Sequence, residues 1–386
     1  MLTTAADWYQ GSVRPISCDG AVASFQISAM APNTGLAYRL DWQQFERWCR
    51  LHGASPLPAT PQTVAAYVAS QASLADADGN WTYAPNTLGR RLAAITKAHE
   101  VAGLLSPCRN AEVTTTMSGI RRQRRTPPRR ATPLLLAELR AVLARIELDR
   151  FPEAVIGRRD AALLVMGFAG AFRRSELVEL VVDDVTLHPQ DGLHIRLRHS
   201  KTDQEGHGAI KALPYGANPD TCPPCAYLRW RQVLDAADAP DSSAASDPQA
   251  TANSGRPAMM RALRAGTCDE AGDLRHICRQ PRPEELLPAD RPLFRAVHKN
   301  GIPGGSPLSG HVVGAVVKRR AVAAGLSAAS LSGHSLRAGF VTQAVRGGAD
   351  ASSIMRQTGH KSHAMVELYR RDYDPLQGNA VTGLGL

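Results

Sequence analysis

The sequence lacks the features of membrane and secreted proteins. It contains no apolar run long enough to cross a bilayer, and residues 1–20 show neither a basic leader before an apolar run nor a small-residue cleavage pattern. Its seven cysteines are odd in number and irregular in spacing, which fits reduced thiols better than a disulfide framework. We therefore expect a cytoplasmic protein with no membrane partner.

Lysine is also scarce, although the chain is basic. Lys and Arg together number 45 against 35 Asp and Glu, a net charge of +10, and only six of the 45 are lysines. This excess of positive charge favours a polyanionic partner, and the planar fork of arginine donors suits phosphate oxygens. A lysine can give up its proton when its surroundings lower its pKa, so a lysine at a special position is informative.

The length predicts two domains, because 386 residues exceed the size at which one hydrophobic core usually keeps growing. Residues 1–27 carry weak periodicity and are expected to form a flexible arm. Helical periodicity and capping signals at Asn33-Thr34, Thr60-Pro61 and Asn86-Thr87 then predict an all-helical domain over 28–120.

A basic segment follows at 121–133. Pro127-Pro128 disfavours a long helix there, so we expect an extended linker. Its arginines could form a solvated spacer, or a strap along a DNA backbone where each arginine near a phosphate releases counterions. The candidate DNA-binding residues are Arg121, Arg122, Arg124, Arg125, Arg129 and Arg130.

The second domain, 134–380, is expected to be mainly helical with a small β-hairpin, so the predicted fold class is mainly α within α+β. Alternating residues over 193–199, a turn-like stretch at 201–208 and an apolar stretch at 209–213 predict the hairpin, with Lys201 at or near its tip. Residues 236–290 are rich in Ala, Ser, Asp and Pro and predict a mobile insertion with short helical pieces at most.

Four short patterns in the second domain carry chemistry, and each is weak alone. An arginine lies at a turn between two apolar helices with an acid three residues on, and a histidine and an arginine three apart share one helix face. A Gly-His pair follows a helix end, with a tyrosine nine residues further, and a lysine projects from the hairpin. These residues are Arg173, Glu176, His334, Arg337, Gly359, His360, Tyr369 and Lys201.

Together and in this order, the patterns resemble the signature of the tyrosine recombinase family, also called the phage integrase family. The resemblance covers most of the chain, because 28–120 is similar to the family's core-binding domain and 134–380 to its catalytic domain. It implies an enzyme that breaks and rejoins DNA strands without ATP, metal or any other cofactor.

The residue types suit phosphodiester chemistry, which needs an in-line nucleophile, stabilisation of negative charge on the non-bridging oxygens, and a proton for the leaving oxygen. Arg173 and Arg337 can clamp the non-bridging oxygens by forked hydrogen bonds. His360 would add a neutral donor to the same phosphate. By resemblance Tyr369 is the nucleophile, which would leave a 3′-phosphotyrosine that a 5′-hydroxyl can reseal.

The family also implies roles for three further residues. Lys201 matches the hairpin lysine that acts as general acid for the 5′-oxygen, and Lys211 is the second choice because it falls on the return strand. His334 matches the histidine linked to proton transfer from the tyrosine. Glu176 matches an acid that orients these groups, and its role is supporting.

Two of these assignments have close neighbours as competitors. Tyr373 lies one helical turn after Tyr369 and could in principle be the nucleophile, but the family spacing from His360 favours Tyr369. Arg174 lies beside Arg173, and the family places its arginine three residues before the acid, which selects Arg173.

A pair of cysteines separated by two prolines is the remaining candidate. Cys222 and Cys225 could bind zinc with Cys268, His276 or Cys278, because paired cysteines at this spacing do so elsewhere. No second tight pair completes the set, so we favour packed or exposed thiols and expect no metal.

The sequence thus predicts a site-specific recombinase that acts through a 3′-phosphotyrosine and a Holliday junction, in the integration or excision of mobile DNA. The resemblance implies double-stranded DNA as partner, a homotetramer on two DNA sites and a place at the nucleoid, and it allows for an accessory DNA-bending protein. The alternatives are an inactive DNA-binding regulator of recombinase ancestry and a type IB topoisomerase-like enzyme that relaxes supercoils.

Overall fold

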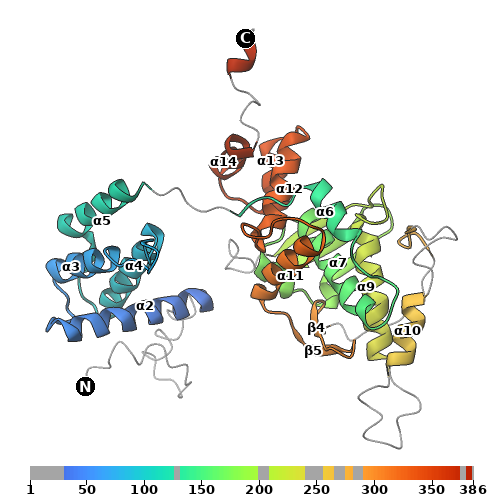
Figure 1. Cartoon of the computed structure of the whole chain (residues 1–386), viewed down its shortest axis with the longest axis horizontal. Coiled ribbons are helices and arrows are strands. Elements are labelled where there is room, and N and C mark those ends of the chain that lie inside the picture. Colours follow the sequence, from blue (N-terminus) through green and yellow to red (C-terminus); the bar gives the residue numbers. More distant parts are fainter. Residues whose placement is uncertain are drawn as a thin grey trace, which may run out of the picture. The chain divides into compact units, whose positions relative to one another are not determined.

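The computed structural model describes residues 30–125, 131–198, 208–239, 255–264, 274–280, 290–373 and 380–384. The chain divides into two compact units, Met1–Arg129 and Arg130–Leu386 (Figure 1). Within the described ranges, no helix combines the length and the hydropathy needed to cross a membrane. The expected arm at 1–27 and the expected hairpin tip at Lys201 lie outside the described residues.

The first unit is built from helices around a small aromatic core. Trp42, Phe45 and Tyr67 are buried in it, and the ring centroids of Phe45 and Tyr67 lie 5.0 Å apart in an edge-on arrangement. In chain order the elements are α2 (Pro32–Leu51), α3 (Pro61–Ala72), α4 (Pro85–Val101), the 3₁₀ helix η2 (Pro107–Arg109) and α5 (Ala111–Arg124).

The starts of these helices differ in part from the predicted caps. Both α2 and α4 begin with a proline, and no side chain caps either of them. The predicted caps at Asn33 and Asn86 are therefore wrong: a proline at the first helical position has a pre-set φ and no N–H to satisfy, so each asparagine lies inside the first turn. Thr60 does cap α3, because its hydroxyl accepts a hydrogen bond from the backbone N of Thr63 at 3.1 Å.

The basic segment predicted as a linker begins as helix. The first three of its arginines lie in the last turn of α5, and Arg125 ends the helix in the left-handed conformation with φ 42°. Arg124 donates to the carbonyls of Ala72 and Tyr83, and its guanidinium lies 4.7 Å over the ring of Trp81. The expected start of the linker at 121 is therefore wrong, because the two prolines come after Arg125 and leave the helix ahead of them intact.

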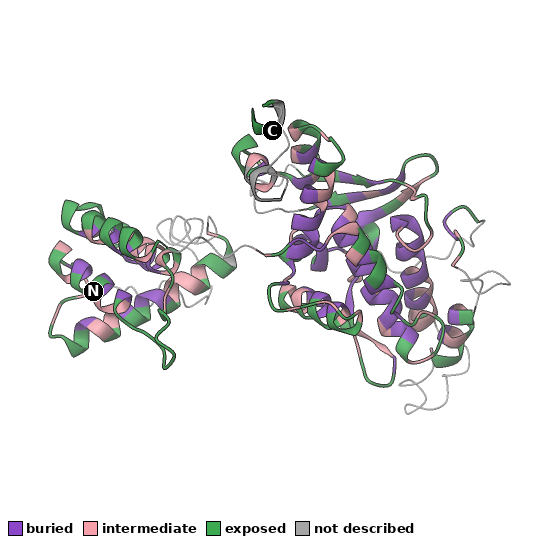
Figure 2. Cartoon of the chain, turned by 45° about the horizontal axis from the view of Figure 1, so that its top comes forward, coloured by how far each residue is buried: buried purple, intermediate pink, exposed green. Residues whose placement is uncertain are grey.

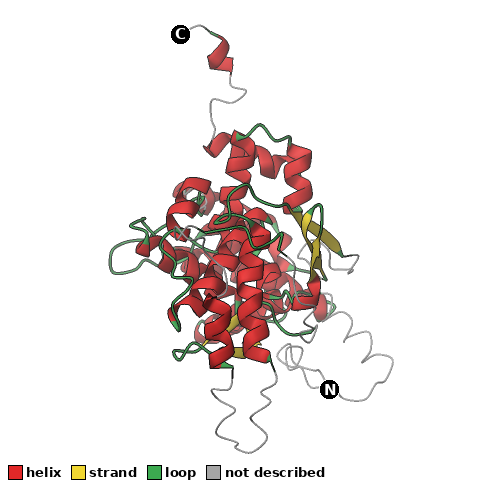
Figure 3. Ribbon diagram, turned by 90° about the vertical axis from the view of Figure 1, so that its right-hand side faces the viewer, coloured by secondary structure: helices red, strands yellow, loops and turns green. Residues whose placement is uncertain are grey.

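The second unit combines many helices with two small antiparallel sheets, drawn in yellow in Figure 3. Its first sheet has the order β1-β2-β3, and the predicted hairpin is confirmed by the pairing of Leu193 with Leu213 and of Leu197 with Ala209. The elements up to the end of this sheet are α6 (Leu136–Leu143), α7 (Glu153–Ala169), α8 (Arg174–Val178), η3 (Val182–Asp184), β1 (Val185–His188), β2 (Gly192–Leu197) and β3 (Ala209–Leu213).

The rest of this unit is mainly helical. The second sheet pairs β4 with β5, and helix α14 is described as far as Tyr373. The Asp-Pro pair that predicts the end of this helix lies outside the described residues. The elements are α9 (Pro223–Asp238), α10 (Arg256–Arg264), β4 (Arg295–Val297), β5 (Pro303–Pro307), α11 (Gly310–Ala323), α12 (His334–Arg346), α13 (Ala351–Thr358), α14 (His363–Tyr373) and η6 (Ala380–Gly383).

The core of the second unit is centred on α7, which is buried over almost its whole length. Leu163, Leu164 and Met166 are fully buried there, and Figure 2 shows buried residues concentrated in the interior of this unit. From Ala161 to Ala169 this helix is apolar on all sides and must be covered on all sides, which is why α9, α11 and α12 pack around α7.

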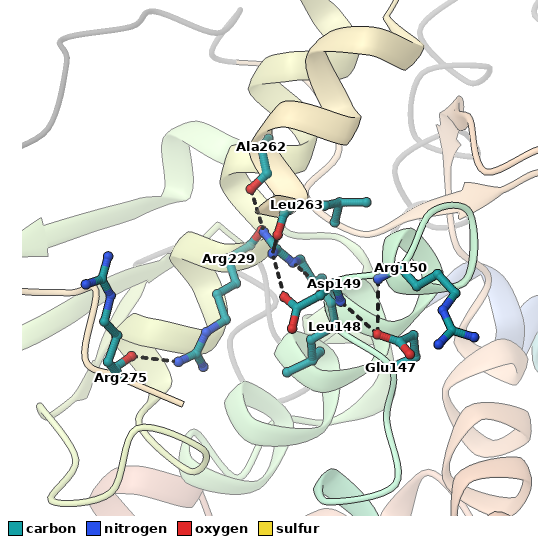
Figure 4. Close-up of polar contacts among 9 residues, drawn as sticks. Glu147, Leu148, Asp149, Arg150, Arg229, Ala262, Leu263 and Arg275 are labelled. Carbon is teal, nitrogen blue, oxygen red and sulfur yellow. Dashed lines mark hydrogen bonds and ion pairs between the residues drawn. The ribbon is translucent and has the colours of Figure 1, made fainter. Parts of the chain in front are cut away.

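Parts of the predicted mobile insertion at 236–290 are packed against this core. Helix α10 buries Met259 and Leu263, and the buried Arg158 of α7 donates to the carbonyls of Leu263 at 2.7 Å and Leu148 at 2.7 Å. Figure 4 shows Ala262 and Leu263 of α10 on one side of these polar contacts and Leu148 and Asp149 on the other. Helix α10 is one of the short helical pieces that the sequence allows in this segment. It packs against the core because the buried guanidinium of Arg158 must have acceptors, and α10 supplies them.

Candidate active site

The turn between α7 and α8 is the backbone frame of the site. An added Cβ at Gly170 would lie 2.1 Å from the ring of Phe172, so the turn leaves no space for a side chain there. Ala171 is buried with φ 46°, a conformation that costs a non-glycine residue about 1 kcal/mol or more. This turn aims the carbonyls of Gly170 and Ala171 at cationic side chains from other elements.

Arg173 is held at the start of α8 by Glu176. The buried carboxylate accepts the backbone N of Arg173 at 2.9 Å through Oε2 and the Arg173 Nη1 through Oε1. On its other side, Arg173 Nη2 donates to the carbonyl of Gly359 at 3.2 Å. The side chain of Arg173 is 16% exposed, so the guanidinium is fixed in place and still reaches the surface.

Arg337 brings a second guanidinium from α12. It is buried and donates through Nη1 to the carbonyl of Ala171 at 2.7 Å. Its pKa is lowered to about 10, first by burial and then by the charge of Arg173, whereas Glu176 and Tyr369 act in the opposite direction. Two guanidiniums beside one carboxylate leave an excess of positive charge, which is suited to binding an anion.

Lys211 of β3 is a third cation at this site. Its Nζ donates to the carbonyl of Gly170 at 2.7 Å and to that of Gln357, and it lies 5.1 Å from the ring centre of Phe172. Its pKa is lowered to about 8, chiefly by burial; Glu176 opposes this lowering, and the charges of the two arginines add to it. The sequence ranked this lysine second to Lys201, which lies outside the described residues.

His360 and Tyr369 come from the end of the chain. Gly359 ends α13 in the left-handed conformation with φ 67°, which turns the chain so that His360 Nδ1 lies 3.0 Å from the Thr358 hydroxyl. Burial and then the charge of Arg337 lower the pKa of His360 to about 4, so its ring is neutral near pH 7. The ring centroid of Tyr369 lies 6.3 Å from that of His360.

Five of the residues named from sequence therefore meet in one place: Arg173, Glu176, Arg337, His360 and Tyr369. His334 is exposed at the first position of α12, close enough for its charge to affect His360. The side chain of Tyr373 lies outside the described residues, so its rivalry with Tyr369 stays open.

Sequence reasoning missed Gln357 and gave Thr358 no role. Gln357 Nε2 donates to the carbonyl of Ala169 at 2.9 Å, and the Thr358 hydroxyl forms a hydrogen bond with His360 Nδ1. Their position directly before Gly359-His360 is a signal in the sequence, but nothing in it says that a glutamine there reaches the end of α7.

Comparison with known proteins places this chain in a family. Residues 285–375 match the model of the phage integrase family. An integrase/recombinase xerD homolog from Selenomonas ruminantium is 35% identical over 355 residues, which make up 91% of this chain and 85% of that protein. The chain belongs to the phage integrase family and is therefore a tyrosine recombinase. Within that family it resembles a XerD-like integrase or recombinase.

Two solved structures share the fold at low sequence identity. XerH site-specific recombinase bound to palindromic difH substrate, a post-cleavage complex, matches with a TM-score of 0.53 and 13% identity, over 95% of this chain and 85% of that one. The Tn1549 transposon integrase in complex with transposon right-end DNA matches with a TM-score of 0.52 and 14% identity, over 95% and 94%. These likenesses confirm the predicted fold class of a helical N-terminal domain followed by a mainly helical catalytic domain.

Proposed function

We propose that this chain is a site-specific DNA recombinase that cuts and rejoins strands through a 3′-phosphotyrosine bond to Tyr369. The observation that carries the proposal is the placement of Arg173 and Arg337 around the single carboxylate of Glu176, with Tyr369 close enough to affect the pKa of Arg337. A tyrosine oxygen beside an excess of guanidinium charge is what in-line attack on a phosphodiester requires.

In the proposed cleavage step, the Tyr369 oxygen forms a bond to the scissile phosphorus while the bond to the 5′-oxygen breaks. Arg173 and Arg337 stabilise the negative charge on the non-bridging oxygens. Lys201 supplies the proton that the 5′-oxygen needs, and His334 takes part in removing the proton of Tyr369. Attack by a different 5′-hydroxyl reverses these bonds and joins the new strand, so no ATP or metal is consumed.

Lys211 is a positioning residue in this scheme. Its Nζ is buried and already donates to two backbone carbonyls. These two hydrogen bonds join the α7–α8 turn to the end of α13. A proton donor must be free to give its proton to the leaving oxygen, whereas Lys211 Nζ is committed to these carbonyls, so the proposed acid stays Lys201, as the family resemblance implies.

The role proposed for His360 depends on its tautomer. The Thr358 hydroxyl has one proton, and its two nearest acceptors are the Ile354 carbonyl at 2.7 Å and His360 Nδ1 at 3.0 Å, with the Met355 carbonyl further away at 3.5 Å. When the hydroxyl donates to Nδ1, His360 carries its proton on Nε2 and can donate to the phosphate. When it donates to Ile354, Nε2 is an acceptor and suits the proton of Tyr369 instead.

DNA binding is proposed for the arginines around the end of α5. Arg121, Arg122 and Arg125 are exposed and free of the contacts that hold Arg124 within the first unit. Arg129 and Arg130 lie outside the described residues and stay predictions. Both solved relatives named above are DNA complexes, which supports double-stranded DNA as the partner. A tetramer on two sites, a Holliday junction, a mobile-element substrate and an accessory bending protein are further parts of the proposal.

Covalent trapping tests the function. The protein is incubated with nicked suicide duplexes tiled from the DNA that flanks its gene, and adducts are separated on a denaturing gel. We expect an adduct that is lost in Tyr369→Phe and kept in Tyr373→Phe. The reverse pattern would move the nucleophile to Tyr373, and tight binding without any adduct would favour an inactive regulator.

A plasmid assay separates recombination from simple relaxation. A recombinase exchanges strands when two copies of its site are present, whereas a topoisomerase-like enzyme relaxes plasmids that carry no site. Relaxation independent of the site would contradict the proposal.

A further inference from the structure

Four potential metal ligands lie together on the side of α9, in a place that the recombinase chemistry does not use. Cys222 and Cys225 stand at the start of α9, and His276 and Cys278 come from the described segment 274–280. The three cysteines are buried, and the ligand atoms of all four residues lie within 4.8 Å of one another. Of the three partners that the sequence offered, His276 and Cys278 are thus the two that lie at Cys222 and Cys225, while Cys268 lies outside the described residues.

The spacing of these atoms matches a tetrahedral zinc ion. Two sulfur ligands of tetrahedral zinc lie roughly 3.8 Å apart, and a sulfur and an imidazole nitrogen roughly 3.6 Å apart. Here Cys222 Sγ and Cys278 Sγ are 3.9 Å apart, and His276 Nδ1 lies 3.4 Å from Cys225 Sγ and 3.8 Å from Cys278 Sγ. The distance between Cys222 and Cys278 is far longer than the roughly 2.05 Å of a disulfide bond.

The surrounding backbone prepares His276 and Cys222 as ligands. His276 Nε2 lies 3.2 Å from the carbonyl of Ala217, which can only accept, so Nε2 carries the proton and the lone pair of Nδ1 points at the sulfurs. The backbone N of Gly216 donates to Cys222 Sγ at 3.3 Å, a contact that favours a thiolate. Contacts of this kind fix the orientation of metal ligands and raise their affinity.

A buried arginine holds the two ligand-bearing segments together. Arg229 lies one turn after Cys225 in α9, and it donates to the carbonyls of Pro219 at 3.0 Å and Arg275 at 2.9 Å. Figure 4 shows its side chain extended toward the backbone of Arg275, the neighbour of His276. The ligand positions are therefore set by contacts outside the cluster itself.

We propose that Cys222, Cys225, His276 and Cys278 form a structural zinc site that fastens the segment 274–280 to α9. Four protein ligands complete a tetrahedron and leave no open position, so the ion stabilises the fold and takes no part in strand cleavage. Binding of Zn²⁺ releases the protons of the three thiols into solution. This site does not depend on the proposed recombinase activity.

Zinc content of the full-length protein tests the site. Protein grown with zinc and purified without a metal-affinity column is assayed by mass spectrometry for metals, and we expect about one zinc per chain. Cys278→Ser and His276→Ala should each lose most of it. Cys108→Ser, which changes a cysteine of the first unit, should keep it.

A second measurement covers variants that fail to fold. Wild-type protein stripped of zinc and loaded with Co²⁺ should show intense thiolate-to-cobalt absorption in the near ultraviolet, and added Zn²⁺ should abolish it. Absence of this band, or wild-type zinc below about a tenth of an ion per chain, would overturn the proposal.

The same variants can also test a second possible location for the zinc ion. His188, Asp191 and His194 form a second cluster of potential ligands on the β1–β2 turn, where they are more exposed. Zinc lost in His194→Ala but kept in both Cys278→Ser and His276→Ala would place the ion there and refute the site on α9.

Discussion

Arg173 and Arg174 are adjacent in sequence, but only Arg173 is held by contacts within the site. Arg173 is fixed by Glu176 and the Gly359 carbonyl, whereas Arg174 is exposed. We expect Arg173→Lys to slow covalent adduct formation by about 100- to 1,000-fold, because a lysine loses the forked contact with a charge that develops in the transition state. Arg174→Lys is the matched control and should stay close to wild type.

DNA affinity should change little in Arg173→Lys, since the residue acts chiefly on transition-state charge. Gel-shift titrations alongside the trapping assay measure both quantities on the same duplex. Equal losses of binding and cleavage would show that Arg173 holds DNA and has no special part in the chemistry.

His360 gives a pH prediction with a defined sign. Its pKa is lowered to about 4 in the folded chain from an ordinary 6.5, so the unfolded chain binds more protons between these values. The neutral ring therefore contributes stability that is complete above pH 6.5 and is lost as pH falls toward 4. Its NMR signals should stay unshifted from pH 8 to about 5.

His360→Gln removes the titrating group and supplies the control. The free energy of unfolding of this variant should fall less steeply than that of wild type between pH 6.5 and about 4. A His360 resonance with a midpoint near its ordinary value would contradict the burial on which the neutral state depends.

At the scale of elements, helices of the second unit pack closely enough to require glycine. A Cβ at Gly339 of α12 would lie 1.9 Å from the carbonyl oxygen of Leu134, whereas Gly119 of α5 has nothing within 4 Å of such a Cβ. We expect Gly339→Ala to lower the free energy of unfolding by about 1–3 kcal/mol, because a backbone oxygen must move. Urea unfolding of the full chain measures this.

Gly119→Ala is the matched substitution in open space. It should leave stability unchanged or raise it by up to about 1 kcal/mol, since alanine is the better helix former. A tolerated Gly339→Ala would mean that α12 can shift away from Leu134 without cost.

The same scale explains why the site depends on several elements. Lys211 and Gln357 are 146 residues apart, yet they are joined by a hydrogen bond and both contact the end of α7. The strand β3 and the helices α7, α8, α12 and α13 thus meet through backbone carbonyls at one point. Substitution of Lys211 should remove the hydrogen bonds that hold the end of α13 against the α7–α8 turn, even though the residue is not the proposed acid.

At the scale of the whole molecule, the net charge of +10 predicts binding to DNA that weakens steeply with salt. Arg121 and Arg122 are exposed at the end of α5, so replacing both with alanine should reduce the slope of log affinity against log salt by roughly 2. Fluorescence anisotropy of a labelled duplex at several NaCl concentrations gives this slope.

Arg124 is the neighbouring control for that measurement. Arg124 donates to the Ala72 and Tyr83 carbonyls, so Arg124→Ala should lower the free energy of unfolding of the first unit. The slope of log affinity against log salt should stay close to that of wild type. A slope unchanged in the double variant of Arg121 and Arg122 would remove these residues from the DNA-binding surface.

Much of the site was accessible from sequence because its signals are local. Arg173 and Glu176 are three residues apart and form a cap contact at a helix start, and Gly359 ends a helix where a left-handed residue is needed. The errors were local too: proline at the first helical position displaced the predicted asparagine caps, and α5 continued through arginines that the following prolines do not reach.

The sequence by itself determined the division into two domains, through the chain length. It also determined the helical periodicity, the hairpin and the order of the reactive side chains, because these depend on neighbours a few residues away. The tertiary structure decided what lies far apart in the chain and close in space. It placed Lys211 against the α7–α8 turn, packed α10 onto the buried Arg158, and brought His276 and Cys278 to Cys222 and Cys225. Such contacts follow from filling a core and satisfying buried polar groups, and no local pattern encodes them.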